Sequence, residues 1–236
     1  LMNLPLPAKV RTITPASTAA PTREKANTPH LFFYISHPDA PYLLVPSTSS
    51  ENRRYVPIGF MDANTIASNA NLIVPHAELY HFGVLTSNVH MAWMRAVAGR
   101  LKSDYRYSNK VVYNNFPWPE PNSEQKALVE ETAHRILLSR DAHPDCTFAD
   151  LYDDSFMPAD LRKAHQDNDR AVMAAYGFKV GMTESECVAE LFKRYQALVA
   201  ARRTRVRGFE IWHLPVAAGG GMLCAGTSYL PEIASA

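Results

Sequence analysis

The stretch Lys102–Pro121, KSDYRYSNKVVYNNFPWPEP, decides how the chain is divided. It begins with cations and aromatic residues, continues through a short β-like run at Val111–Tyr113 and ends in three alternating prolines. The sequence before it is rich in β-like runs, whereas the sequence after it has helical periodicity. We therefore predict an α+β protein, in which a β-rich domain with one or two helices is followed by a small helical domain.

Short apolar runs upstream of this stretch predict β-strands. Leu31–Ile35 and Tyr42–Val45 are separated by HPDAP, whose proline and aspartate favour a turn, so these runs predict a hairpin or two adjacent strands. Pro57 within Val56–Phe60 predicts an edge strand or a bulge, because proline lacks a backbone donor. Two further runs are strand candidates, Leu72–Val74 and Leu79–Leu85.

One helix is predicted before the stretch, over Ser87–Gly99. Thr86 or Ser87 can cap its first turn, and apolar residues recur on one face. Gly99 stands where a left-handed C-terminal residue is expected.

Three helices are predicted after the stretch. Asn122 and Gln125 resemble a capping box, followed by the apolar positions Val129, Ala133, Ile136 and Leu137. A helix near Asp160–Tyr176 is expected to end at Gly177. Thr183–Glu186 is a second capping box, and the apolar stripe that follows it consists of Val188, Leu191, Phe192, Tyr195, Leu198 and Val199.

These patterns predict four segments. Residues 1–29, with five prolines, are expected to form an extended lead-in, and the beginning LMNLPLP is typical of a fragment of a longer protein. Residues 30–119 and 120–205 are the two predicted domains. Residues 206–236 are rich in glycine and alanine without periodicity and are predicted to be a tail.

Composition narrows the class of protein. Hydrophobic residues make up 47% of the 236, enough for a core, but the formal net charge is only +1, so any nucleic-acid surface must arise from clustered charge. Three widely spaced cysteines indicate neither zinc nor a disulfide framework. We see no membrane span and no secretory signal, and we expect a cytoplasmic protein without a membrane partner.

Two clusters have the residue types of a nucleic-acid surface. Between Arg95 and Lys110, five cations are opposed only by Asp104, with tyrosine, serine and asparagine among them; cations bind phosphates, and hydroxyl or amide groups add hydrogen bonds. In Glu51–Arg54, alternation along an extended segment would place Glu51 and Arg53 on one face, where arginine can read guanine and glutamate can accept from cytosine. The alternatives are a solvated loop and a surface ion pair.

Signatures of catalysis are absent from the sequence. An enzyme that methylates an amino group of DNA needs a short Asx/Ser-Pro-Pro-aromatic loop, and Asn115–Trp118 has similar letters in the wrong order. Gly219–Gly221 lacks the strand–helix context of a cofactor-binding turn, and the nine histidines show no metal-ligand spacing. We therefore predict a binding module with no catalytic residue, no metal site and no cofactor site of its own.

The runs PYLLVPSTSSENRRYVPIGF (41–60) and LYHFGVLTSNVHMAWMRAVAGRLKSDYRYSNKVVYNNFPWP (79–119) resemble the target-recognition domain of the MmeI-like family of adenine-specific DNA methyltransferases and restriction–modification enzymes. The helical remainder, to about residue 205, resembles that family's C-terminal domain. The resemblance implies an S-adenosylmethionine-binding methyltransferase domain upstream, a nuclease in some relatives, double-stranded DNA as partner and N6-methyladenine as product.

The resemblance also implies which residues contact DNA. The family's base-reading segment matches Ser50–Arg54, with the acid–base pair at Glu51 and Arg53, and the segment matching Arg106–Ser108 lies where the recognition domain meets DNA. We predict two groups. The base-reading group is Ser50, Glu51 and Arg53, and the phosphate-binding group is Arg54, Arg100, Lys102, Arg106, Tyr107, Ser108 and Lys110.

Two alternatives remain open at this point. The basic stretch can instead dock the module onto the methyltransferase domain, with little DNA affinity of its own. A stand-alone enzyme would need a pocket with perturbed titratable groups, and no sequence feature indicates one.

Overall fold

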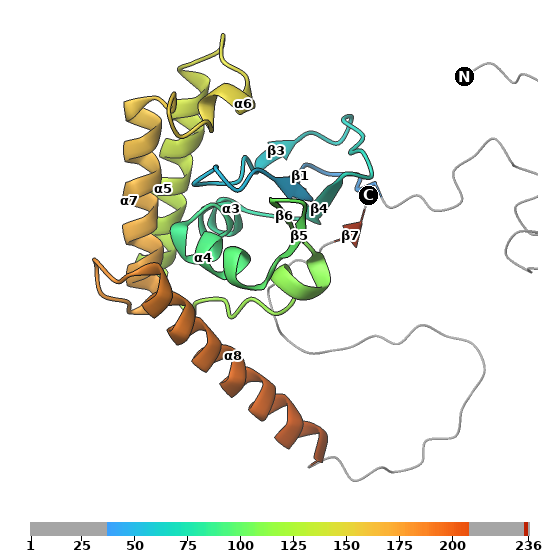
Figure 1. Ribbon diagram of the computed structural model, residues 1–236, viewed down its shortest axis with the longest axis vertical. Coiled ribbons are helices and arrows are strands. Elements are labelled where there is room, and N and C mark those ends of the chain that lie inside the picture. Colours follow the sequence, from blue (N-terminus) through green and yellow to red (C-terminus); the bar gives the residue numbers. More distant parts are fainter. Residues whose placement is uncertain (1–36, 208–233, 236) are drawn as a thin grey trace, which may run out of the picture. The chain divides into compact units, whose positions relative to one another are not determined.

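A computed structural model describes residues 37–207 and 234–235 (Figure 1). The predicted lead-in, the candidate strand Leu31–Ile35 and most of the predicted tail lie outside these residues. The described residues from Pro38 onward belong to one compact unit, which contains two small antiparallel sheets and several helices. The predicted α+β class is confirmed.

The first sheet has the strand order β3-β1-β4-β7. Its members are β1 (Tyr42–Pro46), β3 (Gly59–Met61), β4 (Asn71–Pro75) and β7 (Ala234–Ser235). The strand predictions for Tyr42–Val45 and Leu72–Val74 are confirmed. The strand expected over Val56–Phe60 begins only at Gly59, so Pro57 lies outside it, and it is an edge strand of the sheet, as predicted.

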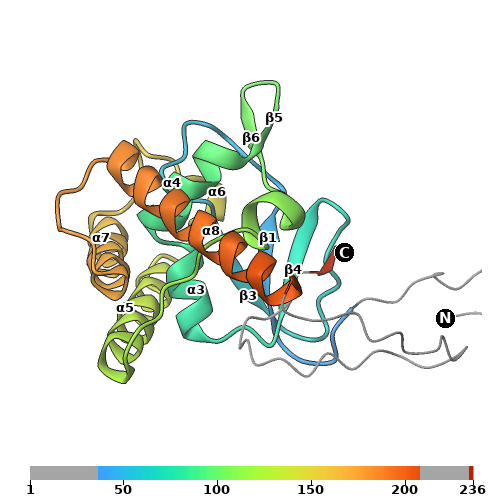
Figure 2. The ribbon, with the colours of Figure 1, turned by 90° about the horizontal axis from the view of Figure 1, so that it is seen from below.

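The second sheet is formed by β2 (Thr48–Ser49), β6 (Asp104–Arg106) and β5 (Gly99–Leu101), in that spatial order. Strand β6 pairs antiparallel with both neighbours: Tyr105 lies opposite Ser49 on one side and opposite Arg100 on the other. Strands β5 and β6 form a hairpin, and Figure 2 shows it projecting away from the helices. This sheet brings the segment after β2 close to the basic stretch.

Leu79–Leu85 is a helix, α3, and the strand prediction there is wrong. Residues 80–85 are all buried, so the segment has no polar face, and periodicity does not separate a buried strand from a buried helix. Tertiary packing decides the outcome. A Cβ added to Gly83 would lie 2.8 Å from Val129 Cγ1 and 3.1 Å from Ala133 Cβ, so α3 packs tightly against the following helical region.

Helix α4 (Asn88–Val97) confirms the helix predicted over Ser87–Gly99, with Ser87 as its N-cap. The role predicted for Gly99 is wrong, because Ala98 ends the helix in an extended conformation and Gly99 begins β5. The β-like run Val111–Tyr113 is also not a strand. It belongs to a π-helical turn, η2 (Asn109–Tyr113), closed by a hydrogen bond from the Asn114 N–H to the Asn109 carbonyl.

Helix α5 (Ser123–Asp141) begins at the predicted capping box, in which the Asn122 side chain accepts from the Gln125 N–H at 2.8 Å. Helix α6 (Phe148–Leu151) is short. Helix α7 (Ala159–Tyr176) ends at Gly177, which has a φ of +69°, as predicted. Helices α5 and α7 run side by side (Figure 1).

Helix α8 (Glu184–Arg207) begins after the predicted capping box, where the Thr183 N–H donates to Glu186 Oε2 at 2.8 Å. It packs on α4 through the Trp93 ring, whose centroid is 5.1 Å from that of Phe192. The apolar stripe predicted for α8 is only partly buried, because Leu191 is buried while Phe192 and Leu198 are exposed.

The hydrophobic core is continuous from the first sheet to α8. It includes Leu43 of β1, Val84 of α3, Trp93 of α4, Ile136 of α5 and Leu191 of α8. Residues on both sides of the predicted domain boundary at 119–120 therefore share one core.

Candidate nucleic-acid interface

The residues after β2 form a turn, which we call the 50–54 turn. The Arg53 N–H donates to the Ser50 carbonyl at 3.2 Å, so the chain reverses between them. Our assumption that Glu51 and Arg53 share a face of an extended segment is therefore wrong. Glu51 lies instead against the hairpin, with its carboxylate 3.5 Å from Arg100 Nη1. Ser50 is half-buried, and its hydroxyl accepts from the Asn52 N–H at 3.3 Å.

The β5–β6 hairpin turns through a two-residue loop at Lys102 and Ser103. Lys102 has a φ of +57°, in the left-handed region that a two-residue hairpin loop requires and that glycine normally occupies. Lys102 is exposed at this tip. Its cation therefore stands at the end of the projecting hairpin seen in Figure 2.

The hairpin cations lie on opposite faces of the second sheet. Arg100 pairs with Tyr105, and because side chains alternate along a strand, Arg106 points to the face opposite Tyr105. Arg100 and Tyr105 therefore share one face, and Arg106 occupies the other with Thr48 and Gly99. The sequence cluster is thus divided between two surfaces.

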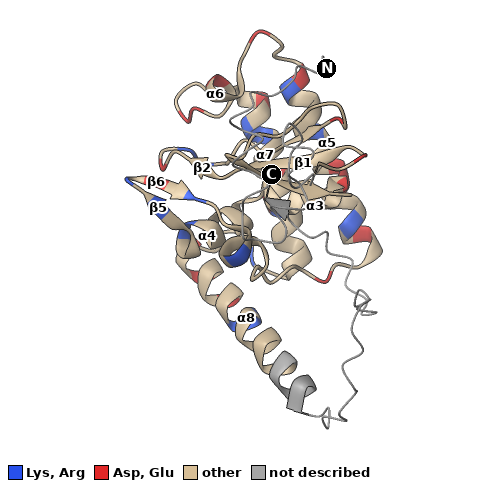
Figure 3. Cartoon of the chain, turned by 90° about the vertical axis from the view of Figure 1, so that its right-hand side faces the viewer, with Lys and Arg blue, Asp and Glu red and all other residues tan. Residues whose placement is uncertain are grey.

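Most cations of the predicted interface have no side-chain partner. Within residues 37–207, this holds for Arg53, Lys102, Arg106 and Lys110. Arg53 is half-buried and the other three are exposed. Figure 3 shows the blue segments that Lys and Arg give to the β5–β6 hairpin. Unpaired cations on a projecting element are free to bind phosphate oxygens.

Tyr107 does not belong to this surface, and its predicted phosphate-binding role is contradicted. Its side chain is buried, and its hydroxyl lies 2.9 Å from His90 Nε2. Burial raises the pKa of the Tyr107 phenol and lowers that of His90 to about 3, so both groups are neutral. The neighbouring Ser108 is half-buried and begins the η2 turn.

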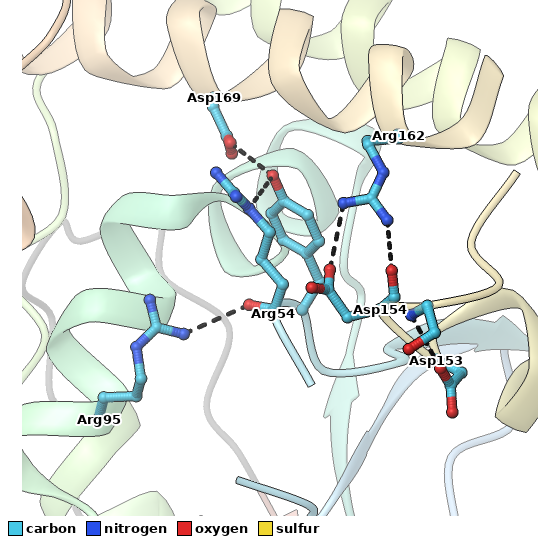
Figure 4. A network of polar contacts seen from close by, with 8 residues as sticks. Arg54, Arg95, Asp153, Asp154, Arg162 and Asp169 are labelled. Carbon is cyan, nitrogen blue, oxygen red and sulfur yellow. Dashed lines mark hydrogen bonds and ion pairs between the residues drawn. The ribbon is translucent and has the colours of Figure 1, made fainter. Parts of the chain in front are cut away.

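The end of the 50–54 turn is fixed to α7. The Tyr55 hydroxyl donates to Asp169 Oδ2 at 2.7 Å, and Arg54 Nε donates to the same hydroxyl at 3.3 Å (Figure 4). Asp169 Oδ1 also accepts from the Asn88 N–H at 2.7 Å, at the first turn of α4. Burial raises the pKa of Asp169 to about 6. One carboxylate thus joins the turn, α4 and α7.

Arg95 makes a second connection to the C-terminal helices. Its Nη1 donates to the Arg54 carbonyl at 3.3 Å, while Nε and Nη2 bind both oxygens of Glu184 at 2.7 and 2.8 Å. These roles of Asp169, Arg95 and Glu184 are not predictable from the sequence. Only the position of Glu184 in a capping box was visible, because partners 89 residues apart leave no local signal.

A hollow of about 500 Å³ lies behind the turn. Its walls include Arg53 and Arg54 from the turn, Ala92 from α4, and Met173 and Glu184 from the C-terminal helices. The 50–54 turn is therefore supported at its two ends, by β2 and by Tyr55, with open space behind it.

The proline-rich connector after η2 packs inside the protein. The Phe116 ring is buried, 4.5 Å from the His90 ring and 6.4 Å from the Tyr176 ring, between centroids. The Tyr176 hydroxyl donates to the Pro117 carbonyl at 2.8 Å. Aromatic residues of this connector therefore join the two halves of the chain, and Phe116 has no face open for a nucleobase.

Metal sites and membrane-spanning helices are two other features to consider in the described part of the chain. Within the ranges that the structure describes, no group of three or more His, Cys, Asp or Glu side chains is placed to hold a metal ion. Among the same residues, no helix has both the length and the apolar character that crossing a membrane requires.

Comparison with known proteins identifies two matching regions. Residues 7–120 match the family described as "MmeI, target recognition domain", and residues 121–202 match "MmeI, C-terminal domain". "DNA methyltransferase A" of Bacillus subtilis (strain 168) is 43% identical over 183 residues, which cover 77% of this chain and 21% of the relative. The chain thus spans about a fifth of that relative's length.

A solved structure is also similar. Its title reads "Structure of Type IIL restriction-modification enzyme MmeI in complex with DNA has implications for engineering of new specificities". The two chains share 51% sequence identity with a TM-score of 0.74, over 81% of this chain and 26% of the other.

Proposed function

This chain belongs to the MmeI family, as its target recognition and C-terminal domains, and from that premise we propose that it directs a longer DNA methyltransferase to a specific DNA sequence. The reaction of that longer protein would transfer a methyl group from S-adenosylmethionine to adenine N6. The relatives are a DNA methyltransferase and a restriction–modification enzyme solved with DNA, which supports double-stranded DNA as the partner.

The observation that carries this proposal is the position of the 50–54 turn beside the β5–β6 hairpin. The Glu51 carboxylate lies 3.5 Å from the hairpin residue Arg100, so a carboxylate acceptor and unpaired cations occupy neighbouring elements. Carboxylates and guanidinium groups read base edges in the major groove, and cations on the same surface bind phosphates. We propose Ser50, Glu51 and Arg53 for base reading.

The phosphate contacts are proposed for the three exposed cations that have no side-chain partner within residues 37–207: Lys102, Arg106 and Lys110. Arg54, at the end of the 50–54 turn, and Ser108, at the start of η2, add further donors. Each contact would fix the position of the duplex, so that the methyltransferase domain can extrude the target adenine from the stack. S-adenosylmethionine would bind in that upstream domain, which is the second proposed partner.

The two domains would divide this work. We propose that residues 30–119 contact DNA and that residues 120–205 support them. Two acids of the helical region support this division. Asp169 accepts from Tyr55, directly after the turn, and Glu184 binds Arg95, which in turn donates to the Arg54 carbonyl.

A charge exchange at the turn tests base reading. Glu51→Lys combined with Arg53→Asp keeps the net charge, so general attraction to DNA is retained while the donor and acceptor positions are exchanged. We expect the preference for the wild-type site over a random duplex to fall about tenfold or more, since a good bidentate contact contributes about 1–3 kcal/mol. Competition binding with a pool of duplexes measures it.

The matched control is Glu131→Lys combined with Arg135→Asp, an exposed ion pair on α5 with the same charge exchange. It should leave the site preference unchanged. An unchanged preference in the Glu51 and Arg53 variant would reject the base-reading assignment.

The alternative function is a docking module that packs on the methyltransferase domain. The exposed apolar side chains of Phe192 and Leu198 on α8 favour some such contact. Salt titration of DNA affinity distinguishes the two functions. A DNA-binding module gives a steep linear decrease of log affinity with log salt concentration, whereas a docking module has almost no affinity for DNA alone.

A further inference from the structure

Arg100 differs from the other cations on the interface because three groups hold it. Its guanidinium carbon lies 3.8 Å from the centroid of the Tyr105 ring. Its Nη1 donates to the Ser103 carbonyl at 2.7 Å and lies 3.5 Å from Glu51 Oε2. Lys102 and Arg106, on the same hairpin, have no side-chain partner among the residues that the structure describes. The geometry therefore separates Arg100 from cations that are free for phosphate.

The support beneath Arg100 is part of the fold. Tyr105 is buried to 8% exposure and belongs to the central strand of the second sheet, opposite Arg100 in the register. A guanidinium stacked on a fixed aromatic ring and bonded to a backbone carbonyl keeps a defined direction. Arg100 thus presents one Nη1 group toward Glu51 from a rigid position.

The ion pair between Arg100 and Glu51 contributes little to the stability of the fold. Both side chains are 45% exposed, and surface ion pairs of this kind add little to folding. Glu51, however, is on a turn and lines the hollow there, and within residues 37–207 its side chain has an ion pair with Arg100 alone. A carboxylate that reads a base must be held in one direction before binding, because each side chain ordered at the interface costs affinity.

From these contacts, we propose that Arg100 is a specificity-determining positioning residue: it holds the Glu51 carboxylate in the orientation that reads a base. This inference rests on the proposed function, and it replaces the phosphate-binding role that the sequence suggested for Arg100. Tyr105 serves as its platform. The phosphate contacts of the hairpin are left to Lys102 at the tip and to Arg106 on the opposite face.

A double-mutant cycle tests the proposal on the complete 236-residue chain. The variants are Arg100→Gln, Glu51→Gln and the two combined, and the measured quantity is the preference for the wild-type site in a competing pool of duplexes. We expect Arg100→Gln to lower the preference about fivefold or more when Glu51 is present, and to have no further effect in the Glu51→Gln background.

Salt titration of the same variants separates positioning from phosphate binding. Arg100→Gln should leave the slope of log affinity against log salt unchanged, whereas Lys102→Gln should reduce the slope by about 0.9 and leave the preference unchanged. Arg135→Gln, on the exposed face of α5, is the control for loss of a surface cation and should change neither quantity. Arg100→Lys should restore only part of the preference, because an ammonium lacks the planar stack.

Three results would overturn the proposal. The first is a slope reduced by about 0.9 in Arg100→Gln with the preference intact, which would make Arg100 a phosphate contact. The second is an equal loss of preference in the Glu51→Gln background, which would make Arg100 a direct reader. The third is no change in either quantity. If the wild-type chain itself shows no site preference, the proposed function fails, and this inference fails with it.

Discussion

Two groups of cationic side chains in this molecule have opposite environments. Arg140 of α5 is only 6% exposed and has every part of its guanidinium in contact with protein. Its Nη1 donates to the Ile58 carbonyl at 2.8 Å, its Nε donates to the Tyr152 hydroxyl at 2.7 Å, and its Nη2 donates to the same hydroxyl. The hairpin cations Lys102 and Arg106 are exposed and, within residues 37–207, have no side-chain partner.

The same positive charge stabilises the fold in one environment and is available to a ligand in the other. The centroids of the aromatic rings of Phe82, Phe148 and Tyr152 lie 5.0–5.3 Å from the Arg140 guanidinium carbon. This cation joins the segment directly before β3 to the C-terminal helical region. The N–H donors of Arg140 bond to acceptors inside the protein. The N–H donors of the hairpin cations remain available to an external partner, as phosphate binding requires.

The largest effect is expected from Arg140→Met. This change leaves the Ile58 carbonyl without its Arg140 donor and removes two charged hydrogen bonds to Tyr152, so the free energy of unfolding should fall by about 3 kcal/mol or more. Denaturant unfolding measures it. Arg135→Met, an exposed position on the same helix, should change it by no more than about 0.5 kcal/mol. Equal effects at the two positions would remove the contrast between buried and exposed cations.

The second prediction concerns pH and the carboxylate that joins the 50–54 turn to α7. Burial raises the pKa of Asp169 to about 6, so the folded state favours the protonated carboxyl. Its contribution to stability is fully present below about pH 4 and is lost as pH rises through 6. This rise in the pKa of Asp169 corresponds to about 3 kcal/mol in the free energy of unfolding. Relative to Asp169→Asn, the wild-type chain should therefore lose about this much stability between pH 4 and pH 7.5.

Comparing the two proteins at each pH isolates this contribution. Burial lowers the pKa of His90 to about 3, and that contribution has the opposite sign, because it is lost as pH falls below about 6.5. It is common to both proteins and cancels in the difference. A stability difference between wild type and Asp169→Asn that does not vary with pH would contradict the raised pKa.

The smallest effect on stability is expected at Arg106, the exposed counterpart of the buried Arg140. Arg106→Gln removes an exposed cation that has no side-chain partner in the described part of the chain, so the free energy of unfolding should change by less than about 0.5 kcal/mol. The slope of log DNA affinity against log salt should fall by about 0.9. Fluorescence anisotropy at several salt concentrations measures the slope. A variant with reduced stability and an unchanged slope would place Arg106 with Arg140 instead.

Local chemistry explains which elements were predicted correctly from the sequence. The capping boxes at Asn122 and Thr183 and the glycine at position 177 specify helix ends through neighbouring residues alone, and the structure has helix ends at all three. Leu79–Leu85 was assigned to the wrong class because its helix is buried on all sides. Its conformation depends on the contact between Gly83 and Val129, which are 46 residues apart.

The candidate site was predictable to a similar degree. The sequence located the two clusters, but it did not reveal which of their residues contact each other and which point into the core. Glu51 was paired with the neighbouring Arg53, whereas the fold places it against Arg100, because β2 and β5 flank the same strand. Tyr107 was grouped with its basic neighbours, although its ring points into the core. Pairings of this kind depend on strand order, which residue type and spacing do not specify.

The continuous core has a consequence for how such proteins can exchange parts during evolution. The two family regions meet between residues 120 and 121, yet Gly83 faces Val129 and Ala133, and Asp169 binds the first turn of α4 across that junction. Recombination at the junction would separate these contacting groups. A new sequence preference is therefore more easily inherited through substitutions at the exposed turn and hairpin than through transfer of the whole recognition region.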